Sequence, residues 1–421
     1  MAIAAESLSD VCRAAKRASR VLATLDTQTK DAALEAIAMA LEERVAEILD
    51  ANALDLEAGR ASGLSEALVD RLALTPARVA AMARGVRAIA ALPDPVGELL
   101  ESYRRPNGLE IRKLRVPLGV IAVVYEARPN VTIDAAALCL KSGNAAVLRG
   151  SSSAAHSNAI LGAVAAEAAS GAGVPEGAIA VIQGGGREEL RELATQTAQI
   201  DLIIPRGGEG LKAALLEHAT VPVIYAASGN CHVYVDASAD LEQARRIVLN
   251  AKVQRPGVCN AAETLLVHRD VAAAFLPAVA AALVGAGVEL RGDELARELS
   301  RPVEVGLASA EDWDTEYLAL TLAVAVVDSL EAAVEHIAEH GSGHSEAIVT
   351  RDHDAAQRFQ LAVDAACVYV NASTRFTDGA EFGMGAEIGN STQKLHARGP
   401  IGLRELCTYK YLIEGDGHVR S

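Results

Sequence analysis

Aromatic residues are scarce in this chain of 421 residues. Phenylalanine, tyrosine and tryptophan make up 3% of it, although hydrophobic residues as a whole make up 51%. The interior must therefore be built from alanine, valine, leucine and isoleucine, the composition of helices packed on parallel sheets. At this length two or three domains are expected, each with a core of its own. The predicted fold class is α/β.

Paired cysteines, long apolar runs and an excess of positive charge are also absent. The six cysteines contain no C-x-x-C pair, which argues against a disulfide framework or a zinc ribbon and favours a reducing compartment. No run of about 18 uncharged apolar residues occurs, and Met1 to Leu22 alternates alanine with charged residues, so we expect no membrane span and no signal peptide. The formal net charge of -16 argues against nucleic acid as a partner. We expect a cytoplasmic protein. The cysteines are Cys12, Cys139, Cys231, Cys259, Cys367 and Cys407.

The chain begins with a helical pattern and then changes character. From Ala4 to about Ala90, apolar residues recur at three- and four-residue spacing, which predicts an all-helical entry. Between Ser102 and Arg115, an Asn-Gly pair separates two extended segments and predicts a β-hairpin. A polar hairpin of this kind often serves an interface.

Two series of short β-rich runs follow, separated by alanine-rich helical stretches. This alternation predicts right-handed crossovers and two parallel sheets, hence two domains with a boundary between Val233 and Gln254. From Gly379 to Pro400 the chain is glycine-rich and irregular, and Leu403 to Ile413 predicts a final strand or tail. The first series is 120–125, 145–148, 178–182, 202–204 and 221–225, and the second is 264–267, 322–327, 347–350 and 367–370.

Cys259 lies in a short loop that contains proline and glycine, immediately before a strand predicted to be buried. Such a loop can expose a thiol, hold it rigidly and let a substrate approach closely, which suits a nucleophile. The alternative is a cysteine that merely fills space in a core.

Several polar segments follow strands of the first series, where open α/β sheets place their ligands. Asn130 can donate an N–H to a developing oxyanion, or it can simply satisfy its own turn. Arg149 and the serines Ser151 and Ser152 suit a ribose or phosphate. Two glycine-rich loops, 184–186 and 205–210, can present backbone N–H groups to a dinucleotide or can be ordinary turns. No G-x-G-x-x-G fingerprint follows the first strand, so an ordinary Rossmann site is not supported.

A metal-site pattern also occurs. His336, Glu339 and His340 have the H-x-x-E-H spacing of inverted zinc peptidases, with His344 nearby. The same residues also fit the polar face and last turn of an amphipathic helix that ends at Gly341. We favour the helix and expect no metal.

Taken together, these motifs resemble the aldehyde dehydrogenase superfamily, and within it the γ-glutamyl phosphate reductase family. The resemblance covers almost the whole chain and is most specific in three long motifs. They are Tyr125-Glu-Ala-Arg-Pro-Asn-Val-Thr, Gln254-Arg-Pro-Gly-Val-Cys-Asn and Phe382-Gly-Met-Gly-Ala-Glu-Ile-Gly-Asn-Ser-Thr-Gln-Lys-Leu-His-Ala-Arg-Gly-Pro. Shorter elements in the superfamily's order are Gly143-Asn144 to Ser152, Ser228-Gly-Asn-Cys231, Glu316 and Asn371.

The resemblance implies an aldehyde dehydrogenase-like fold with two Rossmann-like parallel-sheet domains and a small oligomerisation hairpin. Residues 1–99 and 118–235 would form the NADP-binding domain, and residues 236–398 the catalytic domain. Residues 100–117 and 399–421 would form the hairpin and tail that join subunits into a homo-oligomer.

The resemblance also assigns roles to single residues. Cys259 would be the nucleophile, and its backbone N–H with the Asn130 amide would form the oxyanion hole. The cofactor-binding residues would be Arg149, Ser151 and Ser152 at the adenosine ribose, Pro205, Arg206, Gly207 and Gly208 at the pyrophosphate, and Glu316 at the nicotinamide ribose. Substrate contacts are expected from Arg255, Asn230, Thr374 and Arg375, with surface salt bridging as the alternative for Arg255.

Two departures from the hydrolytic members of the superfamily suggest the chemistry. Ala226 stands where those enzymes place a general-base glutamate, and without that base water is not activated to hydrolyse a thioester. Ser152 stands where NAD-preferring members have a glutamate, and its neutrality together with Arg149 favours a cofactor with a 2′-phosphate. We therefore expect NADPH.

The expected reaction is the NADPH-dependent reduction of L-glutamyl 5-phosphate to glutamate 5-semialdehyde through a Cys259 thioester, a step of proline biosynthesis. A transient contact with glutamate 5-kinase, which supplies the labile substrate, is a further expectation. Two alternatives stay open: a coenzyme A-acylating aldehyde dehydrogenase, and an inactive NADP-binding scaffold.

Overall fold

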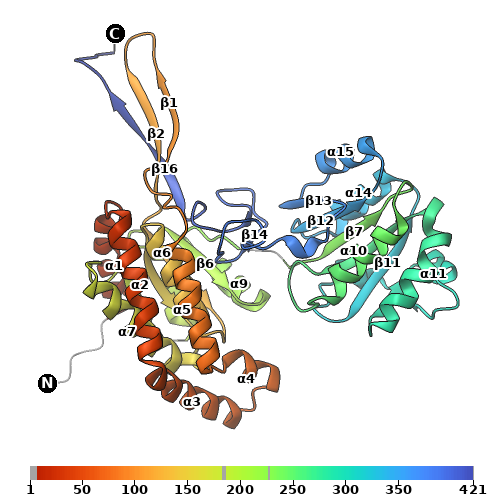
Figure 1. Ribbon diagram of the computed structural model, residues 1–421, viewed down its shortest axis with the longest axis horizontal. Helices are drawn as coiled ribbons and strands as arrows, with labels where there is room; N and C mark the ends of the chain where they lie inside the picture. Colours follow the sequence, from red (N-terminus) through yellow and green to blue (C-terminus); the bar gives the residue numbers. More distant parts are fainter. Residues whose placement is uncertain (1–6, 183–185, 226–227, 421) are drawn as a thin grey trace. The chain divides into compact units, whose positions relative to one another are not determined.

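Two parallel sheets organise the chain, each in a unit of its own. The computed structural model describes residues 7–182, 186–225 and 228–420 (Figure 1). Contacts between residues divide the chain into a first unit, Met1–Tyr225 with Gly383–Gly389 and Ile401–Ser421, and a second unit, Ala226–Phe382 with Asn390–Pro400. The predicted α/β class is confirmed.

Five helices open the first unit, as predicted. Side-chain N-caps start four of them, at Ser7, Asp26, Ser65 and Thr75. The periodic residues of the second helix are buried almost completely, so the spacing seen in the sequence is the spacing of a packed helical face. Throughout the described residues, every helix is too short or too polar to span a membrane. The helices are α1 (Leu8–Leu22), α2 (Thr27–Glu43), α3 (Val45–Ala61), α4 (Glu66–Leu72) and α5 (Pro76–Ala90).

A four-stranded parallel sheet in the order β5-β4-β3-β6 forms the centre of the first unit. The chain runs from β3 outward to β5 and then returns to place β6 on the other side of β3, so the strand order reverses between β3 and β6. Ligands of open α/β sheets bind outside the carboxyl ends of the strands at such a reversal. Its strands are β3 (Val120–Tyr125), β4 (Ala145–Arg149), β5 (Ile179–Ile182) and β6 (Leu202–Arg206), and its helices are α6 (Asn130–Lys141), α7 (Ala155–Gly171), α8 (Arg187–Ala194) and α9 (Glu209–Leu216).

The expected fifth strand of this sheet, 221–225, does not form. In its place there is a single bridge between Val223 and Ile203, beside β6. Pro222 removes a backbone donor within the run, which limits pairing to isolated contacts.

The predicted hairpin and tail form a separate antiparallel sheet of three strands. Strands β1 (Leu99–Arg104) and β2 (Glu110–Pro117) are joined by a turn in which Gly108 has a φ of 98°, and β16 (Cys407–Glu414) pairs along the full length of β2. Figure 1 shows this sheet extending away from the helices of the first unit.

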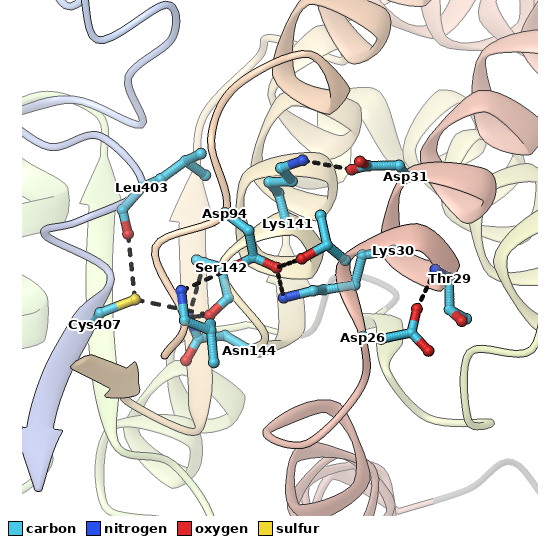
Figure 2. Close-up of polar contacts among 12 residues, drawn as sticks. Asp26, Thr29, Lys30, Asp31, Asp94, Lys141, Ser142, Asn144, Leu403 and Cys407 are labelled. Atoms are coloured by element: carbon cyan, nitrogen blue, oxygen red, sulfur yellow. Dashed lines mark hydrogen bonds and ion pairs between the residues drawn. The ribbon is translucent and has the colours of Figure 1, made fainter. Parts of the chain in front are cut away.

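Buried charges tie the helical entry of the first unit to α6, the helix that follows β3. Lys30 on α2 is fully buried and forms an ion pair with Asp94, which also accepts a hydrogen bond from Thr27 (2.8 Å). Lys141, at the end of α6, is ion-paired to Asp31 and donates to the Ala90 carbonyl oxygen (2.7 Å) (Figure 2). These contacts join α2, α5 and α6.

The same region holds the C-terminal segment. Asn144 donates to the carbonyl oxygen of Leu406 (2.8 Å), and the Cys407 thiol donates to that of Leu403 (3.4 Å). Figure 2 shows the Cys407 thiol between Leu403 and the Ser142 turn. The start of β16 is therefore anchored in the core of the first unit.

Replacing Lys30 by alanine is expected to lower the free energy of unfolding by about 3–5 kcal/mol, because it leaves the Asp94 carboxylate buried without its cation. Lys16→Ala is the matched control, since the Lys16–Asp201 pair is about 30% exposed on both sides and should contribute about 1 kcal/mol or less. Chemical denaturation of both variants measures the difference. Equal losses of unfolding free energy in the two variants would show that the buried Lys30–Asp94 pair contributes no more to stability than the partly exposed Lys16–Asp201 pair.

The second unit contains a seven-stranded parallel sheet in the order β10-β9-β11-β8-β7-β12-β13. Apolar side chains of α10, α11 and α12 cover one face of it, and those of α14 and α15 cover the other. Its strands are β7 (Cys231–Val235), β8 (Ala262–His268), β9 (Glu289–Gly292), β10 (Gly306–Leu307), β11 (Thr321–Val327), β12 (Ser345–Val349) and β13 (Cys367–Val370). Its helices are α10 (Leu241–Val253), α11 (Arg269–Gly285), α12 (Glu294–Leu299), α13 (Ala310–Asp314), α14 (Leu330–His340) and α15 (His353–Ala362).

The domain boundary differs from the expected position at residue 235. Strand β7 pairs with β8 and β12, so it belongs to the second sheet, and the division falls between Tyr225 and Ala226. The irregular C-terminal stretch also divides: 390–400, which contains the short pair β14 (Asn390–Ser391) and β15 (Gly399–Pro400), belongs to the second unit, and 383–389 to the first. Residues 399–400 therefore lie outside the unit that holds the tail.

Candidate active site

Cys259 lies in the turn between α10 and β8, at the amino end of a central strand of the second sheet. It is half-buried, whereas the other five cysteines are buried. Burial raises the pKa of Cys12 to about 11 and the pKa values of Cys139 and Cys407 to about 12, so these thiols stay protonated at neutral pH. Cys259 is thus the thiol that a substrate can reach.

The segment before β7 packs directly against the backbone of Cys259. A Cβ built on Gly229 would lie 1.8 Å from the Cys259 carbonyl oxygen, so only glycine fits there. The Cys231 thiol donates to the same oxygen (Sγ to O, 3.2 Å). Glu316 accepts a hydrogen bond from the Gly229 N–H through Oε1 (2.8 Å). The amino ends of β7, β8 and β11 therefore bring three distant segments together around Cys259.

Two guanidinium groups accompany the thiol. Arg375 is half-buried, and its Nε donates to Gln254 Oε1 (2.8 Å). The pKa of Arg375 is lowered by burial and then by the positive charge of Arg255, while Cys259 and Asp378 act in the opposite direction. Arg375 therefore lies within electrostatic reach of both Arg255 and Cys259, and an anionic substrate would be attracted to the two guanidinium groups.

Asn230 and Thr374, which the sequence predicts to contact the substrate, are buried, and their substrate contacts stay predictions. The Asn230 amide nitrogen donates to the carbonyl oxygens of Trp313 (2.6 Å) and His340 (2.8 Å), and the Thr374 hydroxyl donates to that of Asn260 (2.7 Å). Both side chains hold the backbone around the site, because their donors are already used inside the protein.

In the first unit, Asn130 is exposed at the first turn of α6, after the carboxyl end of β3. Its Nδ2 donates to Asp134 Oδ2 (2.9 Å). Burial raises the pKa of Asp134, while the Asn130 hydrogen bond and the positive charge of Arg206 oppose the rise. The location agrees with the expected edge of the sheet, and the oxyanion role of Asn130 stays a prediction.

Arg149 ends β4 at the same edge and is nearly buried. Its Nε donates to Glu189 Oε1 (3.0 Å), and its Nη2 donates to the Gly186 carbonyl oxygen (3.1 Å). Ser151 and Ser153 share a hydrogen bond of 2.5 Å, and Ser152 is exposed. A phosphate that bound Arg149 would have to compete with Glu189, a contact that the sequence did not suggest.

Residues Pro205 to Gly208 form the end of β6 and the turn into α9, next to the carboxylate of Glu126. Glu126 Oε2 accepts a hydrogen bond from the Gly208 N–H (3.2 Å), at the N-terminus of α9. The Arg206 side chain packs against Gly389: a Cβ built on Gly389 would lie 2.6 Å from Arg206 Nη1. A helix N-terminus favours anions, and here a carboxylate already interacts with it.

The H-x-x-E-H residues lie on α14, which ends at Gly341 as expected. The rings of His336 and His340 are 4.7 Å apart, His336 also contacts the edge of Trp313 (5.4 Å), and His340 Nδ1 lies 2.8 Å from Asp314 Oδ1. Burial lowers the pKa of His336 to about 3. Across the part of the chain that the structure describes, no group of three or more His, Cys, Asp or Glu side chains is arranged so that it could hold a metal ion.

Two predicted features lie outside the described residues. They are Ala226, at the position of the missing general base, and the glycines Gly184 and Gly185 of the first glycine-rich loop.

Sequence reasoning missed two buried pairs behind the site. Lys252 and Glu263 are fully buried with Nζ 2.5 Å from Oε2, and burial raises the pKa of Glu263 to about 7. His232 Nδ1 lies 3.0 Å from Glu346 Oε2 on the opposite face of the sheet. The first pair joins α10 to β8, and the second joins β7 to β12. The only sequence signal for them was the presence of charged residues inside otherwise apolar strands.

Comparison with known proteins agrees with this arrangement. The family model described as "Aldehyde dehydrogenase family" matches residues 1–294. The chain is 57% identical over 415 residues, 99% of each chain, to the γ-glutamyl phosphate reductase of Syntrophomonas wolfei. It is 59% identical over 407 residues, 97% of each chain, to that of Moorella thermoacetica. The crystal structure of γ-glutamyl phosphate reductase from Thermotoga maritima superposes with a TM-score of 0.97 at 46% identity, covering 99% of this chain and 100% of that one. The resemblance inferred from the motifs is confirmed, and the chain belongs to the γ-glutamyl phosphate reductases of the aldehyde dehydrogenase family.

Proposed function

We propose that this enzyme reduces L-glutamyl 5-phosphate to glutamate 5-semialdehyde with release of phosphate, using NADPH. The observation that carries the proposal is that Cys259 is the one half-buried thiol among six cysteines, in a loop that also carries Arg255 and within electrostatic reach of Arg375. A thiolate is a good nucleophile toward an acyl phosphate, and nearby cations attract the anionic substrate.

The Cys259 thiolate attacks the acyl carbon, the bond from carbon to the phosphate oxygen breaks, and phosphate leaves with a thioester on the enzyme. NADPH, when bound, supplies the hydride that reduces this thioester. The carbon–sulfur bond then breaks, so that the semialdehyde departs and the Cys259 thiolate returns to its starting state.

The first unit is proposed to bind the cofactor and the second to carry the nucleophile. Arg149, Ser151 and Ser152 fit a ribose and its 2′-phosphate, because they combine one cation with hydroxyl groups at the carboxyl edge of the sheet. The backbone N–H groups after Pro205 fit the pyrophosphate, and Glu316 is proposed to bind the nicotinamide ribose. The described residues also include six thiols without a disulfide, which fits a reducing cytoplasm.

The antiparallel sheet of the first unit is proposed to join subunits of a homo-oligomer. It carries large side chains that are about half exposed in the single chain: Tyr103, Tyr409, Tyr411 and Ile413. Exposed aromatic and aliphatic groups on one small sheet are typical of an interface.

The reverse reaction tests the activity and separates it from coenzyme A acylation. Incubation with glutamate 5-semialdehyde and NADP⁺ is expected to produce NADPH only when inorganic phosphate is present, because phosphate must accept the acyl group. The absorbance of NADPH follows the rate. NADPH formation with coenzyme A in place of phosphate would instead identify an acyl-coenzyme A-forming enzyme, and no turnover with either would favour a scaffold.

Replacing Arg149 by alanine is expected to raise KM for NADPH about 10- to 100-fold and to leave KM for NADH nearly unchanged, because the 2′-phosphate loses a charge-assisted partner. Glu189→Gln is the matched control, since it breaks the same ion pair and leaves the guanidinium available. Steady-state kinetics with both cofactors measure the effect. If the two variants behave alike, Arg149 is a structural contact of Glu189 and binds no phosphate.

A further inference from the structure

We propose that Glu316 and Cys231 are positioning residues that hold the backbone of Cys259 in place for acyl transfer, independently of any contact with the cofactor. The inference rests on the proposed function insofar as it takes Cys259 as the nucleophile. Glu316 would then have two roles: the predicted contact with the nicotinamide ribose, and the support of the Cys259 backbone within the second unit.

The first element of this support is the close approach of Gly229 to Cys259. With its Cβ absent, Gly229 lets the two backbones meet at a separation that no other residue allows, since a Cβ would lie 1.8 Å from the carbonyl oxygen and 2.5 Å from the Cα of Cys259. Any displacement of Gly229 toward Cys259 would therefore push the nucleophile, and any displacement away would remove its support.

Glu316 fixes the position of Gly229. Its Oε1 accepts the Gly229 N–H at 2.8 Å, across 87 residues of sequence. Glu316 lies in the loop between α13 and β11, and β11 is the neighbour of β8, so the carboxylate reaches Gly229 from the loop that leads into an adjacent strand. The buried Lys252, on α10, lies within electrostatic reach of Glu316: burial lowers the pKa of Lys252, and the charges of Glu263 and Glu316 oppose that lowering.

Cys231 contacts the same carbonyl group of Cys259. Its thiol is fully buried and donates to the Cys259 carbonyl oxygen at 3.2 Å. Burial, with the negative charges of Glu346, Cys259 and Glu263 nearby, raises the pKa of Cys231 well above its ordinary value, so the thiol keeps the proton that it donates.

Together these contacts hold the carbonyl group and Cα of Cys259 in place. The direction of the Cys259 side chain and of its backbone N–H follows from this constraint. Because acyl transfer depends steeply on how the nucleophile is oriented, loss of either contact should slow it even when no cofactor is bound.

The test is the cofactor-free acylation of Cys259 by p-nitrophenyl acetate. The thiolate attacks the ester carbonyl, the bond to the phenolic oxygen breaks, and one equivalent of p-nitrophenolate appears as a burst while the thioester forms. Glu316→Ala is expected to slow the burst about tenfold, whereas Glu316→Gln, which keeps an acceptor oxygen for the Gly229 N–H but loses the charge, should stay within about threefold of the wild type. Cys231→Ala and Cys231→Ser form a second pair, in which serine restores the donor and the rate.

Glu311→Ala, at an exposed position on α13, is the control and should not change the burst. Equal bursts in Glu316→Ala and the wild type, or equal losses in Glu316→Ala and Glu316→Gln, would overturn the positioning role of Glu316. If Glu316→Ala fails to fold, the Cys231 pair decides: a serine variant as slow as the alanine variant contradicts the proposal. A full burst in Cys259→Ala would refute the proposed function itself, which is a separate outcome.

Discussion

Replacement of Cys259 by alanine is expected to abolish the reduction of the acyl phosphate, with a loss in kcat of at least about ten-thousand-fold. No thioester can form without the thiol, and the other five cysteines are buried. The phosphate-dependent formation of NADPH from the semialdehyde measures the loss directly.

Cys12→Ala is the control for this experiment, because Cys12 is a buried residue of α1 in the first unit and its removal should leave turnover almost unchanged. Cys259→Ser should also be nearly inactive, since a serine hydroxyl is far less acidic than a thiol and Ala226 provides no base. Turnover within tenfold of the wild type in Cys259→Ala would rule out the thioester mechanism.

Replacement of Gly229 by alanine is expected to have the second largest effect, a loss in kcat of more than about a hundredfold. The added Cβ would lie 1.8 Å from a backbone oxygen of Cys259, and backbone cannot move aside as the end of a flexible side chain can. The nucleophile or the turn that holds it must shift. Steady-state kinetics together with thermal unfolding distinguish a misplaced nucleophile from a chain that does not fold.

Gly257→Ala, in the turn that carries Cys259, serves as the matched control. The nearest atom to its added Cβ is the Leu318 carbonyl oxygen at 3.7 Å, an ordinary contact, so its effect should be less than about threefold. Similar losses in the two variants would mean that any added methyl group in this region is harmful, and that the contact between Gly229 and Cys259 has no particular role.

Local patterns were sufficient wherever a signal and its partner lie close in sequence. The spacing of Leu34, Ile37 and Leu41 predicted the buried face of α2, and the Asn-Gly pair before Leu109 predicted the hairpin. The same approach failed for 221–225, which has the apolar composition of a strand, because Pro222 removes a backbone donor and only one bridge to β6 forms. The short strands β9 and β10 were missed for the converse reason, since pairing with β11 and with each other defines them.

The sequence alone determined the α/β class, the helical entry and the hairpin and singled out Cys259 among the cysteines, because periodicity, turn chemistry and long specific motifs are properties of neighbouring residues. Tertiary structure alone decided that Asn230 and Thr374 are buried, that Arg149 is paired with Glu189, and that Gly229, Cys231 and Glu316 meet at the backbone of Cys259. Those contacts join residues that are 28 to 114 positions apart in the sequence. They form only when the parallel sheets have assembled, because the sheets bring the ends of adjacent strands together.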